Sequence, residues 1–156
     1  MNTLSNTKKL DFSKADDSCK KHNGRLVDIR DPGEQVYIKA LVLEIEGNPK
    51  GHTWVGDEFW IGATRSPSST DRMPYEWIID NTRFTRDVYQ NWMGGEPNMS
   101  SDEEFCVAMW VGTRDTGTWN DVNCYAVLRA ICKRPLAKDD PSSFVCCICC
   151  VRGFDC

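Results

Sequence analysis

Residues 94–124 read GGEPNMSSDEEFCVAMWVGTRDTGTWNDVNC, and their polar side chains are almost all oxygen donors. These donors are three carboxylates and two amides, on Glu96, Glu104, Asp121, Asn98 and Asn120. Hard oxygen ligands in a loop suit Ca²⁺, whereas Mg²⁺ requires a tighter octahedron and Zn²⁺ favours His or Cys. The residue types therefore predict a metal site, with calcium as the preferred ion. The competing interpretation is a solvated turn, which uses the same residues.

The order of the motifs is more specific than their chemistry. Glu96-Pro97-Asn98 resembles the EPN signature of the C-type lectin domain family, and Trp119-Asn120-Asp121 resembles its WND signature. Glu104 matches the ligand position between them, and Trp60-Ile61-Gly62 resembles the WIG core strand of the family. The resemblance covers residues 10–134.

This resemblance implies one calcium site that also binds carbohydrate. Its ligands for both the metal and the sugar would be Glu96, Asn98, Glu104, Asn120 and Asp121. Two vicinal sugar hydroxyls would complete the coordination shell, and the Glu96–Pro97 bond is expected to be cis. In the family, Glu-Pro-Asn accompanies mannose, N-acetylglucosamine and fucose, so we expect mannose-type glycans as partners.

Two features depart from the family pattern. The positions of its auxiliary calcium site hold Arg65, Ser69 and Met99, which predicts that this second site is absent. Asn98-Met99-Ser100 is an N-glycosylation sequon, and a glycan on Asn98 would block the site.

The nine cysteines indicate an oxidising compartment. The resemblance pairs Cys19 with Cys132 and Cys106 with Cys124. Residues 1–9 contain no apolar signal-peptide region, so we interpret the N-terminus given as truncated or as an artefact of the gene model, and we expect a secreted, extracellular protein.

The periodicity of apolar residues predicts an α+β fold. A first helix is expected to begin at a Ser13 cap and to end at Gly24, and a second to run from an Asp31 cap to about Glu46. Short strands follow, around 59–62, 76–78, 105–111, 118–122 and 125–132, with a long structured loop over 79–104. The resemblance arranges these strands as small antiparallel sheets.

The six tryptophans have two predicted roles. Four lie in or near strand-like apolar runs and are expected in the core: Trp54, Trp60, Trp77 and Trp110. Trp92 and Trp119 flank the predicted site. None is predicted to stack on a sugar.

The chain divides into three parts. Residues 1–9 are expected to be disordered or truncated, 10–134 form the C-type lectin domain, and 135–156 are a cysteine-rich tail. For this tail, palmitoylation, a soft metal, interchain disulfides and translated non-coding sequence remain open.

The net charge of −4 argues against a nucleic-acid partner, and no apolar run is long enough to span a membrane. An enzyme is not expected, because neither His22 nor His52 lies in a nucleophile-like context and the adjacent acids of 102–104 cannot face each other across a glycosidic bond. The leading hypothesis is calcium-dependent glycan binding, with several sites per oligomer for avidity. The alternative is a lectin-like domain that binds proteins, with structural calcium or none.

Overall fold

The computed structural model describes residues 8–45, 57–66, 74–112, 114–137 and 140–148. Its two helices are α1 (Phe12–Lys21) and α2 (Pro32–Ile45). The strands are β1 (Arg25–Leu26), β2 (Asp57–Arg65), β3 (Tyr75–Trp77), β4 (Cys106–Val111), β5 (Trp119–Val122), β6 (Arg129–Ala137) and β7 (Asp140–Ile148). The α+β class predicted from the sequence is confirmed.

The ends of α1 differ from the prediction. Asp11 caps the helix, since its side chain accepts a hydrogen bond from the Lys14 amide at 2.9 Å, so the assignment of the cap to Ser13 was wrong. At the other end Asn23, not Gly24, adopts the left-handed conformation, with φ of 56°. The Gly24 amide then donates to the Cys19 carbonyl at 3.0 Å and closes the helix.

The start of α2 agrees with the prediction. The Asp31 carboxylate accepts from the Glu34 amide at 2.9 Å, and Pro32 takes the first helical position. Glu34 in turn accepts from the Arg30 amide at 2.9 Å, just before the cap.

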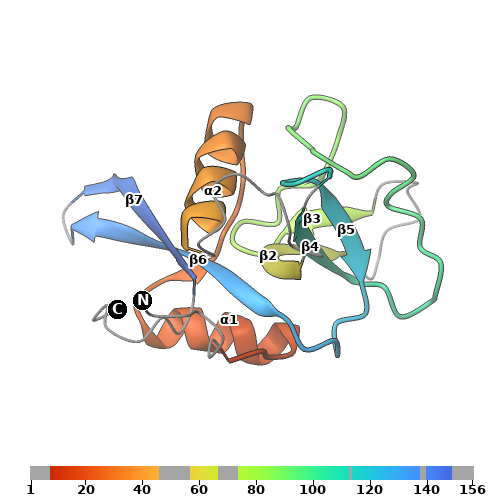
Figure 1. Ribbon diagram of the computed structural model, residues 1–156, viewed down its shortest axis with the longest axis horizontal. Helices are drawn as coiled ribbons and strands as arrows, with labels where there is room; N and C mark the ends of the chain where they lie inside the picture. Colours follow the sequence, from red (N-terminus) through yellow and green to blue (C-terminus); the bar gives the residue numbers. More distant parts are fainter. Residues whose placement is uncertain (1–7, 46–56, 67–73, 113, 138–139, 149–156) are drawn as a thin grey trace.

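The strands form one mixed sheet rather than separate small antiparallel sheets. Its central order is β1-β6-β2-β4-β5, with β3 paired to β2 and β7 paired to β6. The β2–β6 pair is parallel, while the other pairs are antiparallel. β6 therefore lies between β1 and β2 in the sheet and runs between the two helices (Figure 1).

Two hydrophobic cores cover opposite faces of this sheet. In β2, Phe59 and Ile61 pack with Ile38 of α2, whereas Trp60 packs with Phe12 of α1. This alternation follows from the period of two along a strand. Consistently, the two helices lie on opposite sides of β6 (Figure 1).

Both disulfides implied by the resemblance are present. Cys19 of α1 bonds to Cys132 of β6, at a sequence separation of 113. Cys106 at the start of β4 bonds to Cys124 just after β5, at a separation of 18.

The tryptophans follow the prediction with one exception. Trp60, Trp77 and Trp119 are fully buried, but Trp110 is only half-buried. Trp92 packs against Tyr75 and Trp119 in the α2-side core. Trp54 lies outside the described residues.

The C-terminal region contains a strand that the sequence did not predict. β7 pairs with β6 in an antiparallel register that places Cys147 opposite Cys132. β6 itself begins at Arg129 and extends to Ala137, so the strand predicted over 125–132 is displaced. No helix among the described residues is long and apolar enough to cross a membrane.

A buried ionic cluster joins the segment before α2 to β6. Asp28 accepts from Arg25 at 3.2 Å and from Arg30 at 2.7 Å, and Lys133 lies 3.7 Å from the same carboxylate and bonds to Glu34. Burial alone would raise the pKa of Asp28, but the Arg30 hydrogen bond and the charges of Lys133 and Arg25 outweigh it. The pKa of Asp28 is therefore below its ordinary value.

We expect Asp28→Asn to lower the free energy of unfolding by about 2 kcal/mol at pH 7, because three cations lose their shared counter-charge. A depressed pKa stabilises the fold above the unfolded pKa of about 3.9, and this contribution disappears as the pH falls through the folded value. Urea unfolding at several pH values should therefore show the two curves converging towards about pH 3. Asp80→Asn, at the exposed end of the Arg30 pair, is the control and should cost less than about 1 kcal/mol. A loss that stays constant with pH would contradict this account.

Candidate functional site

The loop before β4 turns sharply at a cis Glu96–Pro97 peptide bond, as the resemblance implies. The Glu96 amide donates to the Met93 carbonyl at 2.9 Å, and Gly95 between them has φ of 95°. A cis proline turn brings its two flanking side chains to one side. The Asn98 amide donates to the Glu96 carboxylate at 3.0 Å, which keeps these two residues close together.

Asp121 of β5 is the acceptor on which this loop closes. Its side chain is only 3% exposed, and it accepts from the Met99 amide at 2.9 Å and the Asn98 amide at 3.2 Å. The buried Tyr75 hydroxyl of β3 donates to the same carboxylate at 2.9 Å. Asp121 thus connects the loop to two strands.

The Asn98 backbone amide donates to both the Glu96 carboxylate, at 3.0 Å, and the Asp121 carboxylate, at 3.2 Å, so these two carboxyl groups lie close together. Burial raises the pKa of Glu96, and the hydrogen bond and negative charge of Asp121 raise it further. Burial and the same aspartate also raise the pKa of Tyr75 above its ordinary value. Two carboxyl groups held this close share a proton or attract a cation.

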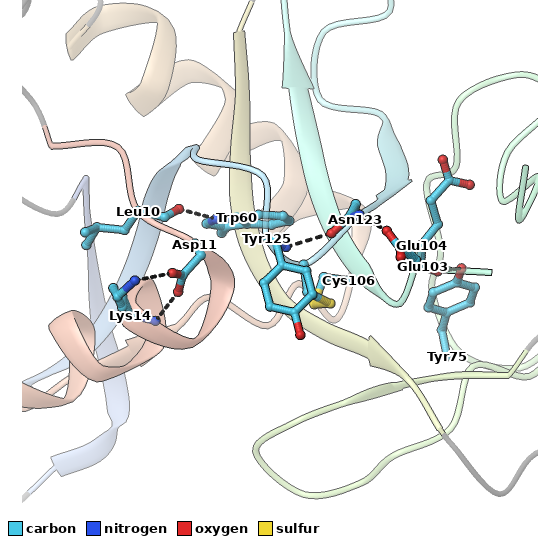
Figure 2. The surroundings of a disulfide bond; sticks show 11 residues. Leu10, Asp11, Lys14, Trp60, Tyr75, Glu103, Glu104, Cys106, Asn123 and Tyr125 are labelled. Carbon is cyan, nitrogen blue, oxygen red and sulfur yellow. Dashed lines mark hydrogen bonds and ion pairs between the residues drawn. A yellow bond between two sulfur atoms is a disulfide. The ribbon is translucent and has the colours of Figure 1, made fainter. Parts of the chain in front are cut away.

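Glu104 faces another part of the loop. Its carboxylate accepts from the Ser100 hydroxyl at 2.9 Å and from the Ser101 amide at 3.2 Å. Figure 2 shows Glu104 next to Tyr75, at the side of the Cys106–Cys124 disulfide.

Asn120 is the predicted ligand that lies farthest from the expected arrangement. Neighbouring residues of a strand face opposite sides of the sheet, so Asn120 points away from Asp121. In the register Asn120 is opposite Ala108, on the face that carries Trp60, and its amide donates to Glu58 of β2 at 3.0 Å.

The donor set fits calcium in chemistry and in part of its geometry. Glu96, Asn98 and Asp121 come together at the cis turn, whereas Glu104 bonds to serines and Asn120 bonds to Glu58. Among the described residues, no three His, Cys, Asp or Glu side chains form a ready metal-binding group. The loop is therefore closed by its own hydrogen bonds. A divalent cation would relieve the repulsion between the Glu96 and Asp121 carboxyl groups.

Comparison with protein families decides what the domain is. The family model described as the Lectin C-type domain matches residues 8–134. This chain belongs to the C-type lectin domain family. The family consists of carbohydrate-binding lectins and not of enzymes.

Known C-type lectins share both its sequence and its fold. The chain is 26% identical to cow E-selectin over 136 residues, which is 86% of this chain and 25% of the selectin. The carbohydrate-recognition domain of cow CD23, solved in the presence of a GlcNAc2Man3 oligosaccharide, is 29% identical with a TM-score of 0.55, covering 79% of this chain and 77% of that one. Herring type II antifreeze protein is 26% identical with a TM-score of 0.61, covering 85% and 88%. The chain thus spans about a quarter of the selectin, and its fold is the C-type lectin fold.

Two residues that bond to the candidate ligands were not predicted from the sequence. Tyr75 lies in the short strand β3. Alternation along this strand predicts that Tyr75 and Trp77 share a face, but it does not show that the Tyr75 hydroxyl reaches Asp121. Glu58 lies before the WIG motif and becomes a partner of Asn120 only through the β2–β4–β5 register.

Proposed function

We propose that this domain binds mannose-type glycans in a calcium-dependent manner, at the cis-proline turn and Asp121. The observation that carries the proposal is that one backbone amide, that of Asn98, donates to both the Glu96 and the Asp121 carboxylates beside the cis Glu96–Pro97 bond. The Lectin C-type family match and the oxygen-only donor set also support it.

In this proposal five residues act as ligands of one Ca²⁺: Glu96 and Asn98 of the EPN motif, Asn120 and Asp121 of the WND motif, and Glu104. When bound, the cation would supply positive charge that stabilises the carboxylates and holds two vicinal sugar hydroxyls. Hydrogen bonds hold Glu96, Asn98 and Asp121 close together at the cis turn, which supports their role, and Glu104 and Asn120 would exchange their present partners for the ligand. Carboxylates accept hydrogen bonds from sugar hydroxyls and asparagine amides donate to them, which selects hydroxyl geometry.

Tyr75→Phe is expected to weaken calcium binding by about tenfold, since outer-sphere partners of metal ligands typically contribute about 10–100-fold. The variant removes only the hydroxyl that positions Asp121, and the ring keeps its packing against Trp92. Calcium calorimetry gives the affinity, and near-ultraviolet circular dichroism checks the fold. Calcium affinity equal to that of the wild type would show that the Asp121 carboxylate needs no support from Tyr75.

The function is tested by binding of the oxidised protein to mannose resin in calcium. We expect release by EGTA and by free mannose, but not by galactose. Retention that EGTA does not reverse, or equal release by galactose, would contradict the proposed metal or the proposed selectivity. One site binds a monosaccharide only at about millimolar Kd, so natural avidity would come from oligomers of this non-enzymatic, secreted lectin.

The second candidate is a lectin-like domain that binds proteins. Its support is the closed loop, in which Glu104 and Asn120 are already bonded within the domain, and the structural likeness to an antifreeze protein. Under this alternative, calorimetry would detect no binding of methyl α-mannoside, whether or not the domain binds calcium.

A further inference from the structure

β7 places a further cysteine beside one of the two disulfides. In the antiparallel pairing of β6 with β7, Cys147 lies directly opposite Cys132, which is bonded to Cys19 of α1. Directly opposite residues of an antiparallel pair have Cα atoms about 4.5–5.5 Å apart. A disulfide requires about 4.4–6.8 Å between its Cα atoms, so the register allows a bond between positions 132 and 147.

Positions 132 and 147 both belong to the face of the sheet that α1 covers. Cys132 packs with Cys19 and with Leu26 of β1 in the core on the α1 side. Opposite residues of paired strands share a face of the sheet. Position 147 is therefore on the same face as the Cys19–Cys132 disulfide.

The neighbouring cysteine of β7 is on the other face. Cys146 is opposite Lys133 in the register, and the Lys133 ammonium bonds to Glu34 of α2. Neighbours along a strand alternate between the two faces, so positions 133 and 146 belong to the α2 side. Of the two adjacent cysteines, only Cys147 shares a face with Cys132.

The chain has the cysteines to supply an attacking thiol. The two disulfides use four of its nine cysteines, and the other five are at positions 146, 147, 149, 150 and 156. Because five is an odd number, pairing among them always leaves one thiol over. The Cys19–Cys132 disulfide is buried, with the two residues 0% and 2% exposed. A thiol in solution reaches such a bond slowly, whereas a thiol on the adjacent strand is already close to it.

We propose that Cys147 competes with Cys19 for the bond to Cys132. The Cys147 thiolate attacks the Cys132 Sγ, so that the Cys132–Cys147 bond forms as the Cys19–Cys132 bond breaks. Cys19 leaves as a thiolate and takes up the proton that Cys147 has lost. The number of disulfides stays the same, so the exchange needs no oxidant or reductant.

The exchange decides whether α1 is covalently tied to the sheet. The Cys19–Cys132 bond links α1 to β6 across a sequence separation of 113, whereas a Cys132–Cys147 bond joins two adjacent strands. After exchange, non-covalent contacts alone hold α1, such as the packing of Phe12 against Trp60 with ring centroids 5.4 Å apart. β7 thus acts as a thiol–disulfide switch on the anchoring of this helix.

Disulfide mapping of the oxidised full chain tests the exchange. The protein is incubated at about pH 8, near the usual thiol pKa, then alkylated with N-ethylmaleimide, digested and analysed by mass spectrometry. We expect about 1–10% of the molecules to contain a Cys132–Cys147 bond together with alkylated Cys19, as for the minor state of a two-state equilibrium. The Cys106–Cys124 bond is the internal control and should stay intact, because the register partners of Cys106 are not cysteines.

Cys19→Ser removes the competing partner and accumulates the product. In a glutathione redox buffer, most molecules of this variant should form the Cys132–Cys147 bond. Adding Cys147→Ser should abolish the bond. Adding Cys146→Ser instead is the matched control and should preserve it, because the register disfavours a bond from position 146 to Cys132 by about tenfold or more.

Equal linkage of Cys132 to Cys146 and Cys147 would show that these cysteines pair without regard to the register, and it would overturn the proposal. Absence of the Cys132–Cys147 bond from the wild-type chain, at a detection limit of about 0.1%, would overturn it whatever the variants show. This second measurement needs no substitution, so it decides the question even if Cys19→Ser fails to fold.

Discussion

Asp121→Asn is expected to weaken calcium binding by at least about 100-fold and to abolish retention on mannose resin. The Asp121 carboxylate holds the loop in place and lies close to Glu96. It accepts hydrogen bonds from three donors, two of which are backbone amides of the loop. The loss of outer-sphere partners alone costs about 10–100-fold in metal affinity, so loss of a ligand charge should cost at least the upper part of that range. Calcium calorimetry measures the effect directly.

Asp102→Asn is the matched control for this substitution. It also removes one negative charge, from the loop that Asp121 of β5 holds, but Asp102 is exposed and lies outside the proposed ligand set. Its calcium affinity should stay within about twofold of the wild type, since single exposed charges contribute little. If both variants lost calcium equally, the net charge of the loop would determine binding, and the geometry around Asp121 would be irrelevant.

Replacing Cys19 and Cys132 together by alanine should lower the free energy of unfolding by about 4–5 kcal/mol. The disulfide closes a loop of 113 residues between α1 and β6. Without it the unfolded chain gains the entropy of that loop, and the midpoint of thermal unfolding should fall by roughly 10–20 °C. Calorimetric unfolding of both proteins measures the difference.

The Cys106 and Cys124 pair provides the comparison, because it spans only 18 residues. Its double alanine variant should lose about 3 kcal/mol, less than the long-range pair. A larger loss for the short pair would show that loop entropy does not dominate, and that this bond acts by holding the strands beneath the site.

The fold was predictable where local chemistry and motif order agree. Asp31, Pro32 and Glu34 form a cap whose signals lie within four residues, and it occurs as predicted. The cap of α1 is Asp11 and not the predicted Ser13. Both residue types can accept a hydrogen bond from an amide three positions later, so local chemistry alone does not distinguish the two positions. Local rules therefore placed α1 correctly within about two residues.

For the candidate site, the sequence named possible ligands but did not show how all of their side chains lie. The cis bond and the closeness of Glu96 and Asn98 follow from the EPN turn. The partners of Asn120 do not, since its direction depends on how β5 pairs with β4 and on what β2 offers across the sheet. Long-range register has no signal in a single sequence.

Trp110 is a second example of a position that the sequence alone did not place correctly. Its apolar neighbours in β4 predicted a core position, but Trp110 lies opposite Glu58 of β2 in the register and is only half-buried.

Calorimetric titration of methyl α-mannoside into the oxidised protein, with calcium in one cell and EGTA in the other, tests the central claim most directly. The account predicts heat of binding with a Kd of about 1 mM in calcium and none in EGTA. Binding in both cells, or in neither while the protein is folded and both disulfides are formed, would contradict calcium-dependent sugar recognition at Glu96 and Asp121.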